Sequence, residues 1–113
     1  MLPSKKYEGA VLGAEGSGVV VDVGEGVNHN LLGRFVSFLG SAWATHCVCE
    51  LTNVILMDSS IDLKDSANAF VNPLTACGQL DIAMKHRAKS VIITASSSSL
   101  SKQFIRLCLK EGI

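Results

Sequence analysis

The residues from 89 to 113 constrain the fold of this chain more than any other segment. They begin with an apolar run, KSVIITA, which ends in small residues and is typical of a strand buried on both faces. A serine-rich loop follows, and apolar residues then recur at helical spacing. One helical stripe contains Leu100, Phe104, Leu107 and Cys108. Gly112 suits the end of that helix, so the segment predicts a strand, a loop and a helix in this order.

The loop before the expected helix contains five serines and no glycine. Serine hydroxyls can donate hydrogen bonds to phosphate oxygens. A serine side chain also adds bulk where a backbone must approach a ligand, and it disfavours a positive φ. Two interpretations therefore stay open. The serines contact a phosphate, or they cap the helix and bind no ligand.

The first half of the chain has the pattern of β structure. Six of its glycines lie between residues 9 and 26, where they bracket the apolar run VVVDV. From the alternation of apolar residues and the turn signals we expect strands at 19–23, 34–39, 43–50 and 53–57. Short strands at this spacing are typical of small barrels and sandwiches.

A change of period after residue 57 predicts helices. A short helix is expected from about Ser66 to Val71. A longer one is expected to run to about Lys85, with Asn72 as its N-cap and Pro73 in its first turn, where no amide donor is needed. The chain is thus predicted to be mixed α/β.

Composition excludes several classes of protein. The formal net charge is zero and no basic stripe alternates with aromatic residues, so we expect no nucleic-acid partner. No apolar run approaches the roughly 20 residues that cross a bilayer, and the first ten residues lack the apolar core of a signal peptide. We therefore expect a soluble intracellular protein without membrane insertion, cytoplasmic rather than mitochondrial.

The cysteines do not predict a metal site. Cys47, Cys49, Cys77 and Cys108 are widely spaced, and we expect buried free thiols. On an extended strand Cys47 and Cys49 would share one face while His46 pointed to the other, so three ligands would not converge. Structural zinc sites also favour cysteine pairs with wider spacing.

The order of motifs resembles that of the medium-chain dehydrogenase/reductase family. The segment LGAEGSGVVVDVGEGVNHNLLGRFVSF is similar to the family pattern G-x-E-x-x-G-x-V-x-x-V-G followed by G-x-x-V. The matching positions are Gly13, Glu15, Gly18, Val20, Val23, Gly24, Gly33 and Val36. NPLTA at 72–76 and VIITASSSSLSKQFIRL resemble the start of the cofactor domain in the quinone oxidoreductase and enoyl reductase branches.

This resemblance implies an architecture and a chemistry. Residues 9–64 would form part of a GroES-like β-barrel, and residues 65–113 would form a linking helix and the first strand–helix unit of a Rossmann domain. Family enzymes transfer a hydride between NADPH or NADH and an activated double bond, a quinone or a carbonyl. Zinc-dependent members carry histidine before the motif glutamate, whereas this chain has Ala14 before Glu15, so no zinc is expected.

The resemblance also nominates residues for cofactor binding, each with a structural alternative. The nominated residues are Asn72, Thr75, Ser97, Ser98 and Ser101. Ser101 stands where the family has a glycine before the body of the helix. Thr75 matches a threonine near the nicotinamide, but it could instead bond to its own helix. Glu15 is either the motif glutamate that supports the active site or a solvated turn carboxylate. No catalytic residue can be assigned.

The length of the chain argues against enzymatic activity of this chain on its own. The expected strands are too few to close the barrel or to build the adenosine pocket, which needs several parallel strands. On its own the chain is therefore expected to be inactive, as a fragment of a quinone or enoyl reductase. The alternative is a non-catalytic remnant that acts as a structural or interaction subunit. Its open sheet edges would pair with a second copy or with a partner chain.

Overall fold

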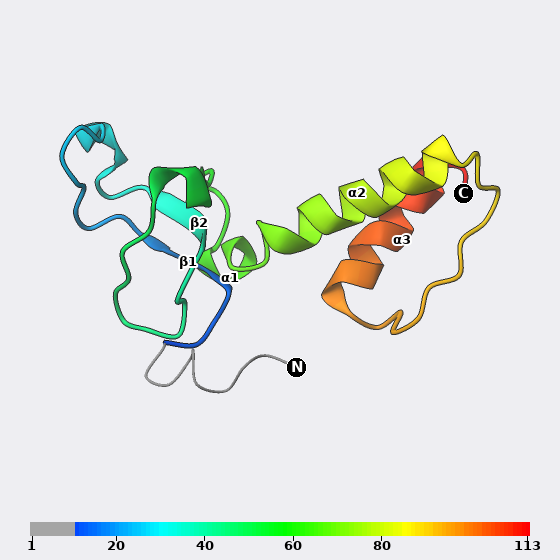
Figure 1. Cartoon of the computed structure of the whole chain (residues 1–113), viewed down its shortest axis with the longest axis horizontal. Coiled ribbons are helices and arrows are strands. Elements are labelled where there is room, and N and C mark those ends of the chain that lie inside the picture. The colour runs from blue at the N-terminus through cyan, green and yellow to red at the C-terminus, as the bar shows by residue number, and fades with distance from the viewer. Residues whose placement is uncertain (1–10) are drawn as a thin grey trace, which may run out of the picture. The chain divides into compact units, whose positions relative to one another are not determined.

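The computed structural model describes residues 11–113, and the predicted mixed α/β class is confirmed (Figure 1). The chain divides into two compact units after Phe70. The first unit contains β1 (Glu15–Val19), β2 (Phe35–Leu39), β3 (Val54–Leu56) and the short helix α1 (Leu63–Ser66). Single 3-10 turns lie at His29–Leu31 and Leu51–Asn53. The second unit contains α2 (Val71–Lys85) and α3 (Ser99–Glu111).

The three strands form one antiparallel sheet in the order β1-β2-β3. On the central strand β2, Val36 and Phe38 are buried on one face. Ser37 points to the other face and is also fully buried. Opposite it in the register lies Ser17 of β1, whose hydroxyl donates to the carbonyl of Leu63. This bond ties α1 to the sheet.

Of the four strands predicted in the first half of the chain, two are confirmed and two are wrong. The confirmed ones are β2 and β3, which fall within 34–39 and 53–57. The strand expected at 19–23 lies earlier, as β1, because pairing with β2 ends where Val19 meets Phe35. Residues 43–50 form an exposed loop in place of a strand. Their alternation lacked a partner, since none of the three strands in the described part of the chain pairs with them.

The helices of the middle segment begin earlier than predicted. Asp62 caps α1 by accepting a hydrogen bond from the Lys64 amide at 2.7 Å, so this helix spans Leu63–Ser66 and not 66–71. Helix α2 begins at Val71, which places Asn72 inside its first turn and not before it as a cap. The predicted end at Lys85 is confirmed.

The segment 89–95 is not the predicted strand. It crosses from α2 to α3 without a ladder partner among the described residues, and Ile92 is 98% exposed. A strand of a parallel sheet needs neighbours on both sides for its backbone groups. Val91 and Ile93 pack instead against the contact between α2 and α3.

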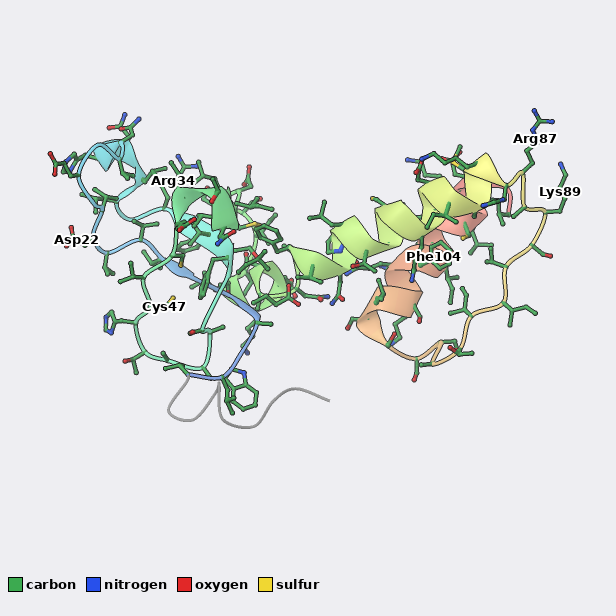
Figure 2. The ribbon with its side chains drawn as sticks, in the orientation of Figure 1. Asp22, Arg34, Cys47, Arg87, Lys89 and Phe104 are labelled. Atoms are coloured by element: carbon green, nitrogen blue, oxygen red, sulfur yellow. The ribbon has the colours of Figure 1, made fainter. Side chains whose placement is uncertain are left out.

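The core of the second unit lies between α2 and α3 and confirms the predicted stripe. Ala76 from α2 meets Phe104 and Cys108 from α3, and all three are buried. Figure 2 shows Phe104 on the side of α3 that faces α2. Gly112 ends α3 with a φ of 76°, a left-handed conformation that suits glycine.

Candidate functional site

The serine-rich loop makes a tight turn immediately before α3. Ala95 has a φ of 52°, in the left-handed region, and its carbonyl accepts from the Ser98 amide at 3.0 Å. Ser96 and Ser97 form the exposed turn between these two residues. The strained residue of the loop is therefore Ala95, and no serine has to adopt a positive φ.

Ser98 is the N-cap of α3. Its hydroxyl oxygen accepts from the Ser101 amide at 3.1 Å, and the same hydroxyl lies 3.0 Å from the Ser101 hydroxyl, to which it donates. The Ser98 carbonyl accepts from the Lys102 amide at 3.0 Å. These bonds leave the amides of Ser99 and Leu100 without an acceptor inside the helix.

Amides without an acceptor in their own helix can bind an anion at the helix start. They lie at the positive end of the helix dipole, and the neighbouring residues Ser96, Ser97 and Ser99 are exposed and carry hydroxyls that can also donate. Ser101 differs from these serines because it is buried and holds the cap. Capping and phosphate binding are compatible at this loop, since the capping bond of Ser98 leaves the first two amides of the helix available.

Asn72 and Thr75 lie on α2, in the same unit. Asn72 is in the first turn of the helix and Thr75 follows it, and both side chains are half-buried. The connection between the helices returns along the unit, so α2 and α3 run in the same general direction (Figure 1). Asn72 and Thr75 therefore lie at the N-terminal end of α2, and the serines lie at the N-terminal end of α3. Glu15 belongs to the first unit, where it opens β1 opposite Leu39 and is half-buried, not in a turn.

The cap gives a direct prediction for stability. Replacing Ser98 with alanine removes the acceptor of the Ser101 amide and should destabilise the second unit by about 1 kcal/mol. Chemical denaturation followed by circular dichroism measures this loss. Ser97→Ala is the matched control, since Ser97 is exposed in the turn. Equal unfolding midpoints for the two variants would contradict the role of Ser98 as a cap.

The first unit contains an open, mostly apolar cleft of about 740 Å³. It lies between the strands β1 and β2 and the loop that follows β2. Its apolar lining includes Val19, Val20, Val21, Val27, Leu31, Val36, Phe38, Val48, Leu51 and Val54. Cys47 and Cys49 belong to the loop side of the cleft.

The cysteines are free, as predicted, but they are not all buried. Only Cys108 is buried in the described part of the chain, whereas Cys47 and Cys77 are exposed and Cys49 is half-buried. The expected burial failed at Cys47 and Cys49 because the strand that should have carried them is a loop. Within residues 11–113 no three histidine, cysteine, aspartate or glutamate side chains gather closely enough to hold a metal ion. No helix in this range has both the length and the apolarity needed to cross a membrane.

The chain is similar to parts of two proteins that are named as reductases. Over 109 residues it is 32% identical to the mitochondrial enoyl-[acyl-carrier-protein] reductase of Xenopus tropicalis, a match that covers 92% of this chain and 31% of that protein. The crystal structure of a protein named NADPH:quinone reductase from Mesorhizobium loti matches with a TM-score of 0.79 and 35% identity. That match covers 89% of this chain and 31% of the other.

A second solved structure supports the fold. It comes from Bacillus thuringiensis, is also named NADPH:quinone reductase, and matches with a TM-score of 0.60 at 24% identity over 87% of this chain and 30% of that one. No family model matches the sequence.

The chain therefore has the fold of part of a reductase. The resemblance to the medium-chain dehydrogenase/reductase family that the motifs indicated is confirmed, since proteins named enoyl reductase and NADPH:quinone reductase match about nine-tenths of this chain. It spans about a third of the length of the relatives that it matches.

Two features of the site were missed from the sequence. The amides of Ser99 and Leu100 are backbone donors, and the signal for them was the cap residue Ser98 one position earlier. The proximity of Cys47 and Cys49 was assigned to one face of a strand, although a loop produces it. The spacing of the two cysteines carried the signal, but the type of element was wrong.

Proposed function

We propose that this chain supplies part of an NAD(P)H-dependent reductase, in which the start of α3 receives the pyrophosphate of the coenzyme. The second unit would be the opening of a Rossmann domain, and the first unit would be part of a GroES-like barrel on the substrate side. The reaction would be hydride transfer to a quinone, an enoyl double bond or a carbonyl. The observation that carries this proposal is the capped start of α3, with two unbonded amides, in a relative of NADPH:quinone reductase.

The residues at the start of α3 fit a diphosphate. The amides of Ser99 and Leu100 would donate to its oxygens, and the exposed hydroxyl of Ser97 would add a further donor. Ser98 and Ser101 hold the helix start in place through their mutual bonds. Ser101 would not obstruct the approach of the backbone to the diphosphate, because Ser101 is only 7% exposed and its hydroxyl is bonded to Ser98.

The other nominated residues would act on the nicotinamide side. Thr75 would offer a hydroxyl and Asn72 an amide group near the beginning of α2. When bound, the coenzyme supplies the hydride, so the chain need not provide a nucleophile and base of its own. Whether the bound form is NADPH or NADH depends on residues that read the ribose 2′ position beyond this segment.

Replacing Ser98 with aspartate separates coenzyme binding from folding. Aspartate caps a helix as well as serine does and suits the positive end of the dipole, so the unfolding midpoint should be kept or raised. Its negative charge would stand beside the phosphate and should weaken NADPH binding about tenfold or more. Coenzyme fluorescence measures the affinity and circular dichroism the stability.

The contrast among Ser98 variants decides the outcome. Ser98→Ala loses the cap without adding charge, so it should lose stability while its folded form keeps most of its affinity. At an NADPH concentration of 100 times Kd, the unmodified chain should gain about 2.7 kcal/mol in its free energy of unfolding. Equal NADPH affinity of Ser98→Asp and the unmodified chain, or no binding at millimolar coenzyme, would reject the site.

A second candidate function is a structural or interaction subunit. Large apolar side chains support it, since Trp43 is 77% exposed and Val48 of the cleft is fully exposed. A second copy or a partner chain would cover such surface and pair with the open sheet. Sedimentation of the purified chain distinguishes a monomer from a self-associated form. A stable monomer that fails to bind NADPH would leave only a different partner chain for this second function.

A further inference from the structure

Cys47 and Cys49 form a close pair of thiols in the loop after β2. Their sulfur atoms lie 3.8 Å apart, and neither is in a disulfide. Figure 2 shows Cys47 on this loop, which belongs to none of the strands. Both cysteines line the cleft of the first unit, so the pair is accessible to small molecules.

The two sulfurs are close enough for a small adjustment of the loop to bring them together. A disulfide has a sulfur–sulfur distance of about 2.05 Å, so these two sulfurs, which lie 3.8 Å apart, must approach each other by roughly 1.8 Å. Val48 between them is fully exposed and has no packing to lose when the loop adjusts. The loop belongs to no strand or helix, so no ladder bonds oppose the change.

The two thiols differ in their surroundings. Cys47 is exposed, whereas Cys49 is half-buried. Burial, followed by the sulfur–sulfur hydrogen bond and the charge of Cys47, raises the pKa of the Cys49 thiol above its ordinary value. Since the thiolate is the nucleophile, Cys47 is suited to attack first and Cys49 to react second.

We propose that Cys47 and Cys49 are a dithiol site that undergoes exchange with small disulfides of the glutathione class and closes to an internal disulfide. The site uses no residue of the serine loop and does not depend on coenzyme binding. Cys77, exposed on α2, and Cys108, buried in the core of the second unit, have no such neighbour among the described cysteines.

The exchange proceeds in two balanced steps. The Cys47 thiolate attacks one sulfur of glutathione disulfide, forms a mixed disulfide and releases one glutathione thiolate. Cys49 then gives up its proton and attacks the Cys47 sulfur, and the second glutathione leaves. The two protein thiols are oxidised to one disulfide while glutathione disulfide is reduced to two glutathione molecules, so two electrons pass between them.

The experiment titrates the full reduced chain with mixtures of reduced and oxidised glutathione, followed by acid quenching and mass spectrometry of its peptides. The peptide with Cys47 and Cys49 should lose two hydrogen atoms and retain no glutathione. The peptide with Cys77 is an internal control and should carry only glutathione adducts. Cys49→Ser should accumulate an adduct at Cys47, because the second step is removed, while Cys47→Ser should accumulate less at Cys49.

Two results would contradict the dithiol site. Stable glutathione adducts at Cys47 in the unmodified chain, in the same proportion as at Cys77, would overturn the proposal. A disulfide that joins Cys47 or Cys49 to Cys77 would overturn it as well. The first measurement needs no variant, so a folding defect in either serine variant leaves the test intact.

Discussion

Replacing Phe104 with alanine should lower the free energy of unfolding of the second unit by about 3 kcal/mol. Phe104 is buried between α2 and α3, where it meets Ala76 and Cys108. Its removal leaves a cavity that these small neighbours cannot fill. Because a small unit has little stability to lose, the helical signal in far-UV circular dichroism should fall at ambient temperature.

The matched control lies on the opposite side of the same helix. Leu109 is 72% exposed, so Leu109→Ala removes apolar surface that is already in water and should change stability by less than about 0.5 kcal/mol. Similar losses for Phe104→Ala and Leu109→Ala would mean that α3 does not bury the predicted stripe. That result would contradict the arrangement of the second unit.

Replacing Gly13 with alanine should destabilise the first unit by about 2 to 4 kcal/mol. Gly13 has a φ of 93°, which an alanine adopts only under strain. An added Cβ would lie 2.7 Å from Cδ1 of Trp43 and 2.9 Å from its backbone nitrogen. The indole can move, but that nitrogen donates to the Leu12 carbonyl at 2.9 Å and cannot yield without losing this bond.

The fluorescence of Trp43 reports this change, since it is the only tryptophan of the chain. Gly24→Ala is the control, because a Cβ there meets nothing within 4 Å and its φ is not in the left-handed region. Denaturant midpoints of Gly13→Ala and Gly24→Ala should therefore differ clearly. A Gly13→Ala chain as stable as the control would show that residues 12–14 do not run beside Trp43.

Local signals were sufficient where a segment makes its own bonds. The stripe of α3, its stop at Gly112 and the last residue of α2 depend on helical period and on termini, and all were predictable. Strand β2 was also found, because its apolar residues meet both neighbours in the sheet. In each of these segments the chain itself supplies the partners that the pattern requires.

The sequence misled where a pattern needed a partner elsewhere. Residues 43–50 alternate as a strand does, and 89–95 has the composition of a strand in a parallel sheet, yet neither is paired among the described residues. Strand propensity reports fit to a sheet surface and does not supply the neighbouring ladder. The position of β1 failed by a few residues for a related reason, since register with β2 decided its end.

The candidate site was predictable in residue type and not in role. Serines at the start of α3 were identified, but only the geometry separates the capping pair Ser98 and Ser101 from the exposed donors. The two serine hydroxyls could equally have faced a ligand or the helix, since both are donors and acceptors. Backbone amides leave no mark of their own in a sequence beyond the cap that precedes them.

Amide resonances of the isotope-labelled chain, followed by NMR during titration with NADPH, test the central claim most directly. The account predicts that the amides of Ser99 and Leu100 shift progressively with coenzyme, while those of Val36 and Phe38 in the sheet stay in place. Unchanged amides at the start of α3 up to millimolar NADPH would contradict it.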